Sequence, residues 1–282
     1  MKKTILFLAM VCLIQVAFGQ TYIENKQKVS GKWKSKGSPY IVRGEAIVPA
    51  GEKLIIKPGV VVKFNTSTVR DYGEEGFRAG FLRVEGTLVA KGKSKKLIEF
   101  TRHGDYGNWG VVLIDSDATD HLIENCLFHH SYYVRGIVPG DNATGALTFH
   151  RTTGHVENCL FVNNGWTALN CKKKAYPKVE QCTFDNNAYA IECNSGSRPF
   201  VNNCIIWNSK NDNFYVNGDA VPTISFSCID EDELDYSIRS KGGNIYNQDP
   251  KFMNPSYEDY RLRKDSPCIK KGAKSKDMGF LY

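Results

Sequence analysis

The chain has 282 residues, of which 24% are charged; this is enough for one sizeable folded body, and all-β bodies of this length are often single domains. Its net charge of +7 is modest, its basic residues are scattered, and it has no nucleic-acid-binding motif, so a nucleic acid is not an expected partner. Long amphipathic helical patterns are absent, which argues against helical bundles.

The first 19 residues have the pattern of a bacterial signal peptide. Lys2 and Lys3 form a basic start, residues 5–16 are apolar but too few to span a bilayer comfortably, and residues 17–19 form a small-x-small cleavage site. We therefore expect cleavage near Gly19 and export to the periplasm, the cell surface or the medium. No later segment is expected to span a membrane.

Next in chain order come short apolar runs that are separated by Gly and Pro. Such runs are typical of short strands bounded by turns. They lie at residues 41–48, 54–64, 81–89 and 97–101.

The second half of the chain repeats with a period near 22 residues. One series shares a Cys at the same phase, at residues 123–128, 156–161, 179–184 and 201–206, with a weaker copy at 226–229. A second series alternates with it, at residues 111–115, 146–150, 168–172, 190–194 and 213–217. A coil that returns to the same lateral position makes each residue stack on its equivalent, about 4.8 Å away. We therefore predict an all-β fold, a single-stranded parallel β-helix of about nine coils over residues 20–248.

Side-chain parity is consistent with this architecture. In the second series the second and fourth positions are apolar and should point inward, while the third and fifth should point outward. In the first series Asn125, Asn158 and Asn203 should occupy a tight bend, because Asn tolerates the left-handed conformation and its side chains can hydrogen-bond from coil to coil. Residues 249–282 are expected to form a segment that covers the last open coil.

Several segments resemble the right-handed β-helix, pectin lyase-like superfamily of secreted bacterial proteins. They are Ser38-Pro-Tyr-Ile-Val-Arg-Gly with residues 47–64 near the start, and Asp249-Pro-Lys-Phe, Asp259-Tyr-Arg-Leu and Ser266-Pro-Cys-Ile-Lys-Lys-Gly near the end. The resemblance covers about residues 32–279 and implies a right-handed helix. It does not imply one activity, since the fold is shared by lyases, hydrolases, esterases and non-catalytic surface proteins.

Eight cysteines follow the leader. Five of them, Cys126, Cys159, Cys182, Cys204 and Cys228, should form one stacked column, and Cys171 and Cys193 should begin another. Side chains in a parallel stack point the same way, so we expect buried thiols, with one or more disulfides as the alternative.

The outward positions of the second series are the candidate glycan-binding surface. They form a grid of hydrogen-bonding groups that sugar hydroxyls and carboxylates need, with neighbouring columns about 6.6 Å apart. The residues are Asp115, Thr148, Asn170, Glu192, Asn194, Tyr215 and Asn217. The simpler interpretation is a solvated sheet face.

Catalysis by β-elimination is the alternative. His150 or Lys172 would be the base, and Arg151 or a bound metal would neutralise a uronate carboxylate. Hydrolysis fits poorly, because Asp115 and Glu192 should lie about 14 Å apart. The family's familiar catalytic signatures are absent, which makes an enzyme less favoured than a binding protein.

No cofactor and no metal site is expected. Calcium is the one metal considered, at Asp115, Asp117 and Asp120 or in the acidic run 230–235, although neither has an EF-hand pattern. An insertion at residues 129–144 should project as a loop beside the grid.

The sequence therefore predicts an exported, monomeric β-helix that binds a polysaccharide, with an acidic one favoured by the basic charge, or is accessory to glycan breakdown. A polysaccharide lyase and a non-catalytic structural surface protein are the alternatives.

Overall fold

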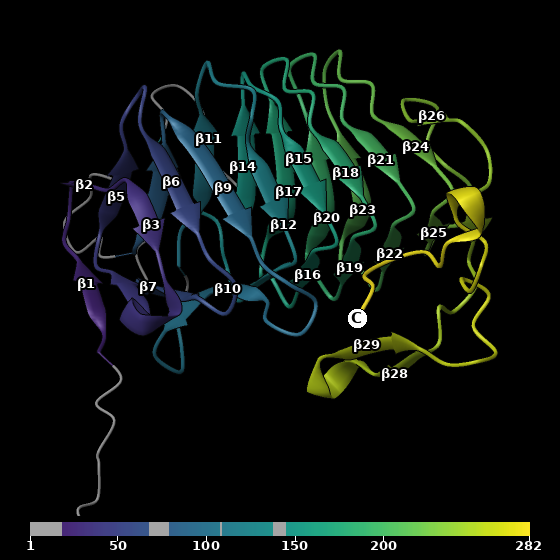
Figure 1. The fold of residues 1–282 in the computed structure, drawn as a ribbon. Helices are drawn as coiled ribbons and strands as arrows, with labels where there is room; N and C mark the ends of the chain where they lie inside the picture. The colour runs from purple at the N-terminus through teal and green to yellow at the C-terminus, as the bar shows by residue number, and fades with distance from the viewer. Residues whose placement is uncertain (1–18, 68–78, 108, 138–144) are drawn as a thin grey trace, which may run out of the picture.

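The computed structural model describes residues 19–67, 79–107, 109–137 and 145–282; the expected signal peptide up to residue 18 lies outside these ranges. The chain winds through three parallel sheets, so that each coil adds one strand to each sheet in turn (Figure 1). All strand pairs in these sheets are parallel and in register between coils. The prediction of an all-β parallel β-helix is confirmed.

Three sheets, named A, B and C in the order in which the chain visits them, make up the coils. Sheet A contains β1 (Thr21–Ile23), β4 (Tyr40–Val42), β7 (Val61–Asn65), β10 (Ile98–His103), β13 (Cys126–His129), β16 (Leu160–Val162), β19 (Thr183–Asp185), β22 (Ile205–Trp207), β25 (Cys228–Ile229) and β27 (Ile245–Tyr246). Sheet B contains β2 (Gln27–Lys28), β5 (Glu45–Val48), β8 (Phe81–Val84), β11 (Val112–Asp115), β14 (Leu147–His150), β17 (Thr167–Lys172), β20 (Tyr189–Cys193) and β23 (Asp212–Val216). Sheet C contains β3 (Gly31–Trp33), β6 (Lys53–Ile56), β9 (Thr87–Lys91), β12 (Leu122–Glu124), β15 (His155–Glu157), β18 (Lys178–Glu180), β21 (Phe200–Asn202), β24 (Thr223–Ser225) and β26 (Arg239–Ser240).

The core is a set of columns in which like residues stack. Phe100, Phe128, Phe161 and Phe184 form one column, with ring centroids 4.5, 4.9 and 4.8 Å apart and nearly parallel planes. The predicted inward positions of the second series, such as Leu147 and Phe149, lie in the same buried cluster. Because each ring stacks on the next, the aromatic positions hold the coils in register.

The bend between sheets C and A is made by residues in the left-handed conformation. Asn125, Asn158, Gln181 and Asn203 have φ between 51° and 59°. The Asn158 amide donates a hydrogen bond to the Asn125 side-chain oxygen at 2.8 Å, as the predicted asparagine ladder requires.

The cysteine column is confirmed for four residues and wrong for the fifth. Cys126, Cys159, Cys182 and Cys204 are buried free thiols at the same position of successive coils. Cys228 instead pairs in register with Ile205, one residue after the column, so Ser227 takes the inward position. Cys171 and Cys193 are register partners in neighbouring strands and begin the second column, as predicted.

The C-terminal segment folds back along sheet A, and in Figure 1 the strands β28 (Phe252–Asn254) and β29 (Asp259–Leu262) lie beneath β16, β19 and β22. The two strands are antiparallel. Phe252, Tyr260, Met278 and Phe280 pack against outward apolar residues of sheet A in a second buried cluster. The segment thus covers the side of the helix rather than only its last coil.

A buried histidine joins this segment to sheet A. His129 lies 3.0 Å from a carboxylate oxygen of Glu99 and 3.1 Å from one of Glu258. Burial alone would lower the pKa of His129, but the hydrogen bonds and charges of the two glutamates outweigh it and raise the pKa to about 9. The imidazolium is therefore the form that holds the segment.

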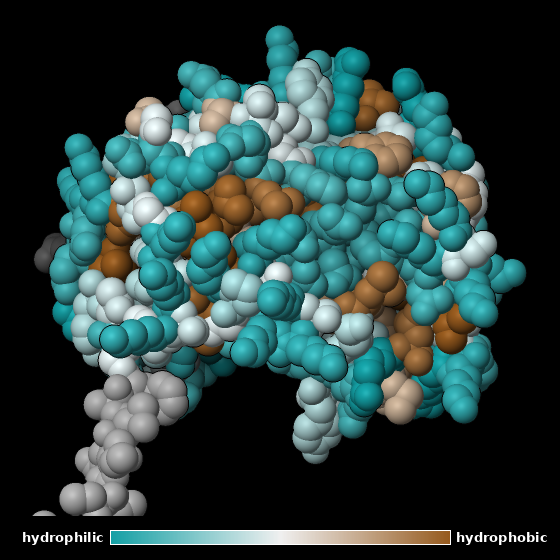
Figure 2. Space-filling view, viewed as in Figure 1, coloured by the Kyte–Doolittle hydropathy of each residue, from teal (hydrophilic) through white to brown (hydrophobic). Residues whose placement is uncertain are grey.

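Sheet C, in contrast to sheet A, is not covered by the C-terminal segment (Figure 1). Figure 2 shows mostly hydrophilic side chains on this face, with apolar ones gathered over its N-terminal strands, where Ile55, Val89 and Leu122 stack in register and are half-buried. Apart from strands, the described residues form only three short 3₁₀ helices: η1 (Ser35–Gly37), η2 (Pro255–Tyr257) and η3 (Ala273–Ser275). No helix in this part of the chain is long and apolar enough to cross a membrane.

Candidate functional site

The turns that lead from sheet A into sheet B place a column of aromatic side chains at the edge of sheet B. Asn163 and Asn186 have φ of 56° and 53°, and the Asn186 amide donates to the Asn163 side-chain oxygen at 2.6 Å. The next residues, Asn164 and Asn187, are fully buried and point inward, joined by a hydrogen bond of 2.8 Å.

These buried asparagines also tie each turn to the preceding coil. Asn164 donates to the carbonyl oxygen of Phe128 at 3.1 Å, and Asn187 donates to that of Phe161 at 2.7 Å. Satisfying otherwise unpaired backbone groups in this way fixes the turn conformation. Two residues after each buried asparagine, the chain emerges at the surface.

The emerging residues are aromatic in three successive coils. Tyr133, Trp166 and Tyr189 are each half-buried, and Tyr215, one coil further, is 43% exposed. Neighbouring ring centroids lie 5.3, 5.3 and 5.6 Å apart along this row. We call these four side chains the aromatic stripe. Its first three rings lie at the edge of sheet B, and Tyr215 lies in β23, as the register partner of Glu192 and not of Tyr189.

The tyrosine before Tyr133 supports the stripe. The Tyr132 ring lies so close to Gly165 that a Cβ at Gly165 would sit 2.5 Å from it. Its centroid is 6.2 Å from that of Trp166. Gly165 is therefore required for the packing that holds the indole.

The predicted polar grid lies on the outer face of sheet B, as expected, but most of it is covered. Arg151, Tyr215 and Asn217 are exposed, and Asp115 and Asn194 are half-buried. The other predicted site residues are buried; they are Thr148, His150, Asn170, Lys172 and Glu192.

The insertion after β13 supplies part of this cover. Val134 and Ile137 pack on Leu113 and Phe81, which point outward from sheet B. Arg83 donates a 2.8 Å hydrogen bond to the carbonyl oxygen of Ile137. The rest of the predicted insertion, residues 138–144, lies outside the described residues. The segment that the sequence predicts as a projecting loop therefore lies, in its described part, on the sheet, because it carries apolar side chains that the sheet can bury.

The proposed catalytic side chains form an ion cluster at the end of β11 and β14. His150 Nδ1 lies 2.9 Å from Asp115 Oδ1, and Arg151 Nη2 donates to the same oxygen at 2.7 Å. Burial alone would raise the pKa of the Asp115 carboxyl, but these two hydrogen bonds outweigh it and hold the pKa below its ordinary value. Lys172 stacks on His150 in the next coil.

A second polar cluster lies closer to the aromatic stripe. The Glu192 carboxylate accepts hydrogen bonds from the Thr167 hydroxyl and the Asn194 amide, both at 2.9 Å. Tyr215 is the register partner of Glu192 in the next coil. The structure thus brings the predicted residues Glu192 and Asn194 together next to Tyr215 of the stripe.

A cleft of about 900 Å³ opens where the stripe and sheet B end. The last coil has no sheet B strand, and the acidic run 230–235 passes there instead. Tyr215 and Asn217 border the cleft, with Asp212, Glu231 and Tyr236. Burial, together with neighbouring aspartates, raises the pKa of Glu231 above its ordinary value.

Metal ligands are not assembled in the part of the chain that the structure describes: no group of three or more His, Cys, Asp or Glu side chains is arranged to hold an ion. Asp115 is turned to His150 and Arg151, and Asp120 is turned to Lys53, with a 2.7 Å ion pair. The calcium hypothesis therefore gains no support from these carboxylates.

The sequence places Tyr215 in the grid and Tyr133 in the insertion, but sequence reasoning missed Trp166, Tyr189 and the stripe that the four rings form. The signal is an Asn-Asn-x-aromatic pattern, which occurs at Asn163-Asn164-Gly165-Trp166 and at Asn186-Asn187-Ala188-Tyr189. The pattern falls between the two repeat series and therefore belongs to neither.

Comparison with known proteins adds one finding. Residues 109–254 match a family model described as a right-handed β-helix region. No curated protein matches the chain significantly.

Proposed function

The chain belongs to the right-handed β-helix family, and on that premise we propose that it binds a polysaccharide along the outer face of sheet B, with the aromatic stripe as the main contact. The observation that carries this proposal is the row of four rings in successive coils, spaced 5.3 to 5.6 Å apart. Aromatic rings offer broad apolar faces to pack against, and a linear row suits an extended polymer better than a compact ligand.

Polar groups stand where a bound sugar would need them. Glu192 and Asn194 flank the stripe, and Asn217 borders the cleft at its end. A binding surface with aromatic contacts and a few fixed hydrogen-bonding groups is the usual composition of a ligand site. The cleft gives the polymer a place to leave the stripe or to end.

Binding is favoured over β-elimination by the burial of the two candidate bases. His150 is 3% exposed and Lys172 6%. A general base must come within hydrogen-bond reach of the substrate proton, directly or through one water. Export to the bacterial periplasm, surface or medium and a monomeric state are part of the same proposal, and they rest on the sequence pattern of the leader and on the family resemblance.

A glycan array with the mature chain, followed by titration of any bound glycan, tests the proposal. We expect Trp166→Ala and Tyr189→Ala each to weaken binding about fivefold or more, which corresponds to about 1 kcal/mol. Tyr176→Ala is the matched control, because Tyr176 is 48% exposed and has no place in the stripe.

Three results would contradict the proposal. Unchanged affinity in both stripe variants would remove the stripe as the contact surface. Release of unsaturated products from an acidic glycan, followed by absorbance and abolished in Lys172→Ala, would show a lyase instead. An array without any bound glycan would favour a structural role.

A further inference from the structure

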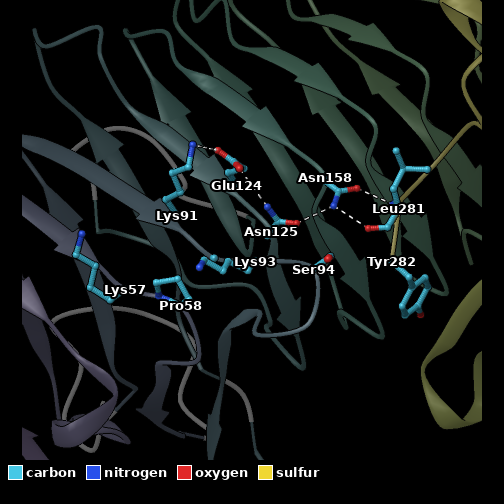
Figure 3. A pocket seen from close by; sticks show the side chains of 11 residues that line it. Lys57, Pro58, Lys91, Lys93, Ser94, Glu124, Asn125, Asn158, Leu281 and Tyr282 are labelled. Atoms are coloured by element: carbon cyan, nitrogen blue, oxygen red, sulfur yellow. Dashed lines mark hydrogen bonds and ion pairs between the residues drawn. The ribbon is translucent and has the colours of Figure 1, made fainter.

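A groove of about 720 Å³ lies at the corner between sheets C and A, away from sheet B. Figure 3 shows Lys57, Lys91 and Lys93 along one side and Tyr282 at the other. Asn125 and Asn158 of the asparagine ladder lie between them. The expected glycan surface on sheet B shares none of these residues.

Charge along this corner changes sign once, from positive in the N-terminal coils to negative in the later ones. Lys91, Glu124, Glu157 and Glu180 are register partners, and Lys57 directly follows β6, one coil before Lys91. Glu124 is paired with Lys91 at 2.8 Å, and Glu180 is paired with Lys178 at 2.6 Å.

The lysines at the groove are less fully paired. Among the described residues, Lys57 and Lys93 have no ion pair, and Lys95 and Lys96 extend the same turn. The positive charge of the groove side therefore exceeds the negative charge opposite it. The backbones of lysines on adjacent coils lie about 4.8 Å apart, so their side chains form a row of positive charges.

The C-terminal tail stops at the edge of this groove. Gln181 donates to the carbonyl oxygens of Asp277 and Gly279, and Asn158 binds both backbone groups of Leu281, at 2.6 and 2.9 Å. One coil further, at Asn125, the corner is open. The Tyr282 side chain, 49% exposed, forms the wall at that point.

We propose that this groove binds an anionic oligosaccharide, with its carboxylates on Lys57 and Lys93 and one sugar ring against Tyr282. Lysines act as flexible point charges that suit carboxylates repeated along a chain. The exposed tyrosine supplies an apolar face for the ring. This site goes beyond the proposed function, since it is separate from the stripe and specifies the charge of the ligand.

Calorimetric titration with tetragalacturonate, and with its fully methyl-esterified form as the uncharged match, tests this inference. We expect the acid to bind, the ester to bind at least tenfold more weakly, and binding of the acid to weaken as salt is raised. Lys57→Gln with Lys93→Gln should lower the affinity at least tenfold. Lys241→Gln with Lys264→Gln is the control, because it removes the same charge from exposed positions elsewhere.

The outcomes separate this site from the stripe. Trp166→Ala should leave tetragalacturonate binding unchanged. If Trp166→Ala abolishes it while the double lysine variant does not, the groove inference fails and the stripe proposal stands. Equal binding of acid and ester, no binding of either, or binding of poly-glutamate without tetragalacturonate would also overturn the groove inference.

A second, independent observation concerns Cys228 and Cys268. Cys228 leaves the inward column because of its shifted register and joins the outer cluster that the C-terminal segment covers. Cys268 belongs to the same cluster, and both are fully buried. Interaction with Cys268 is the main cause that raises the pKa of the Cys228 thiol. The ladder cysteines lie at the same position of successive coils and point in parallel, as Cys159 does toward the backbone carbonyl of Ile123.

We infer that Cys228 and Cys268 form a disulfide that fastens the C-terminal segment to β25 when a disulfide oxidant is present. The two thiols would lose two protons and two electrons to a compound such as oxidised glutathione, which becomes two thiols. The step joins two sulfurs that lie in the same buried cluster.

Alkylation during denaturation without reductant tests this inference on protein that has been exported to the periplasm of an expression host. We expect the mature chain to react at six of its eight cysteines and to yield one linked peptide pair containing Cys228 and Cys268. Reductant should lower the melting temperature of this protein but not of Cys268→Ser. Alkylation of all eight cysteines, or a link between any other pair, would overturn the inference.

Discussion

Replacing His129 by glutamine should remove a pH-dependent contribution to stability. The side chain is 9% exposed and lies between the carboxylates of Glu99 and Glu258, so its charge is poorly hydrated. Its pKa of about 9, against an ordinary value of 6.5, corresponds to about 3 kcal/mol of stabilisation. Because the folded pKa is the higher one, this stabilisation is complete below pH 6.5 and is lost as the pH rises through 9.

The groups around His129 define the pH range in which its effect can be measured. Arg102 and His130 are the basic neighbours, and the pKa of His130 is lowered to about 4, mainly by burial and then by the charge of His129. Above about pH 5.5 His130 is therefore neutral and does not interfere. Hydrogen bonding to His129 lowers the pKa of Glu258, which keeps its carboxylate charged across this range.

Urea denaturation of the native chain and of His129→Gln at about pH 5.5 and pH 9.5 measures the effect. The free-energy difference between the two proteins should be about 3 kcal/mol at the lower pH and should nearly vanish at the higher one. Subtracting the variant removes the contribution of lysines and tyrosines that titrate near pH 10. A difference that does not depend on pH would refute the charged bridge.

Three further predictions concern the core and the site. Phe161→Ala should cost about 3–5 kcal/mol in urea denaturation, because it empties the middle of the phenylalanine column, whereas Tyr176→Ala should cost little. Asn187→Ala should lower the melting temperature and alter the fluorescence of Trp166, since it removes the hydrogen bonds that hold the turn, and Asn217→Ala should do neither. Arg151→Gln should raise the pKa of Asp115 in an NMR titration; an unchanged value would remove the guanidinium as its cause.

Much of the fold follows from the sequence because stacking repeats a residue type at a fixed phase. The sequence alone predicts the period near 22 residues. It also predicts the inward pairs, such as Leu169 and Cys171, and the left-handed asparagines at the bend. Each of these positions is fixed by its equivalents one coil away, so the repeat contains the structural information.

The departures occur where the repeat stops. Cys228 keeps the residue type of the column but not its register, because the last coil begins one residue later relative to β22. Thr148 and Asn170 are buried although they belong to the predicted outward positions. Val134 and Ile137, which pack on Leu113, lie outside the periodic strands, and no repeat predicts where such a segment folds. The aromatic stripe was missed because Tyr133 and Trp166 lie in turns between strands and Tyr189 is the first residue of β20, just before the repeat series.

The in-register turns also make the proposed ligand-binding surface modular. Asn163 and Asn186 lie 23 residues apart and make the same turn, so a tandem copy of this stretch would add one coil and one more ring. In a solenoid each unit contacts only its neighbours, and such an insertion leaves both ends unchanged. Evolution or design could thus match the protein to a longer polymer by copying coils, without rebuilding any single contact.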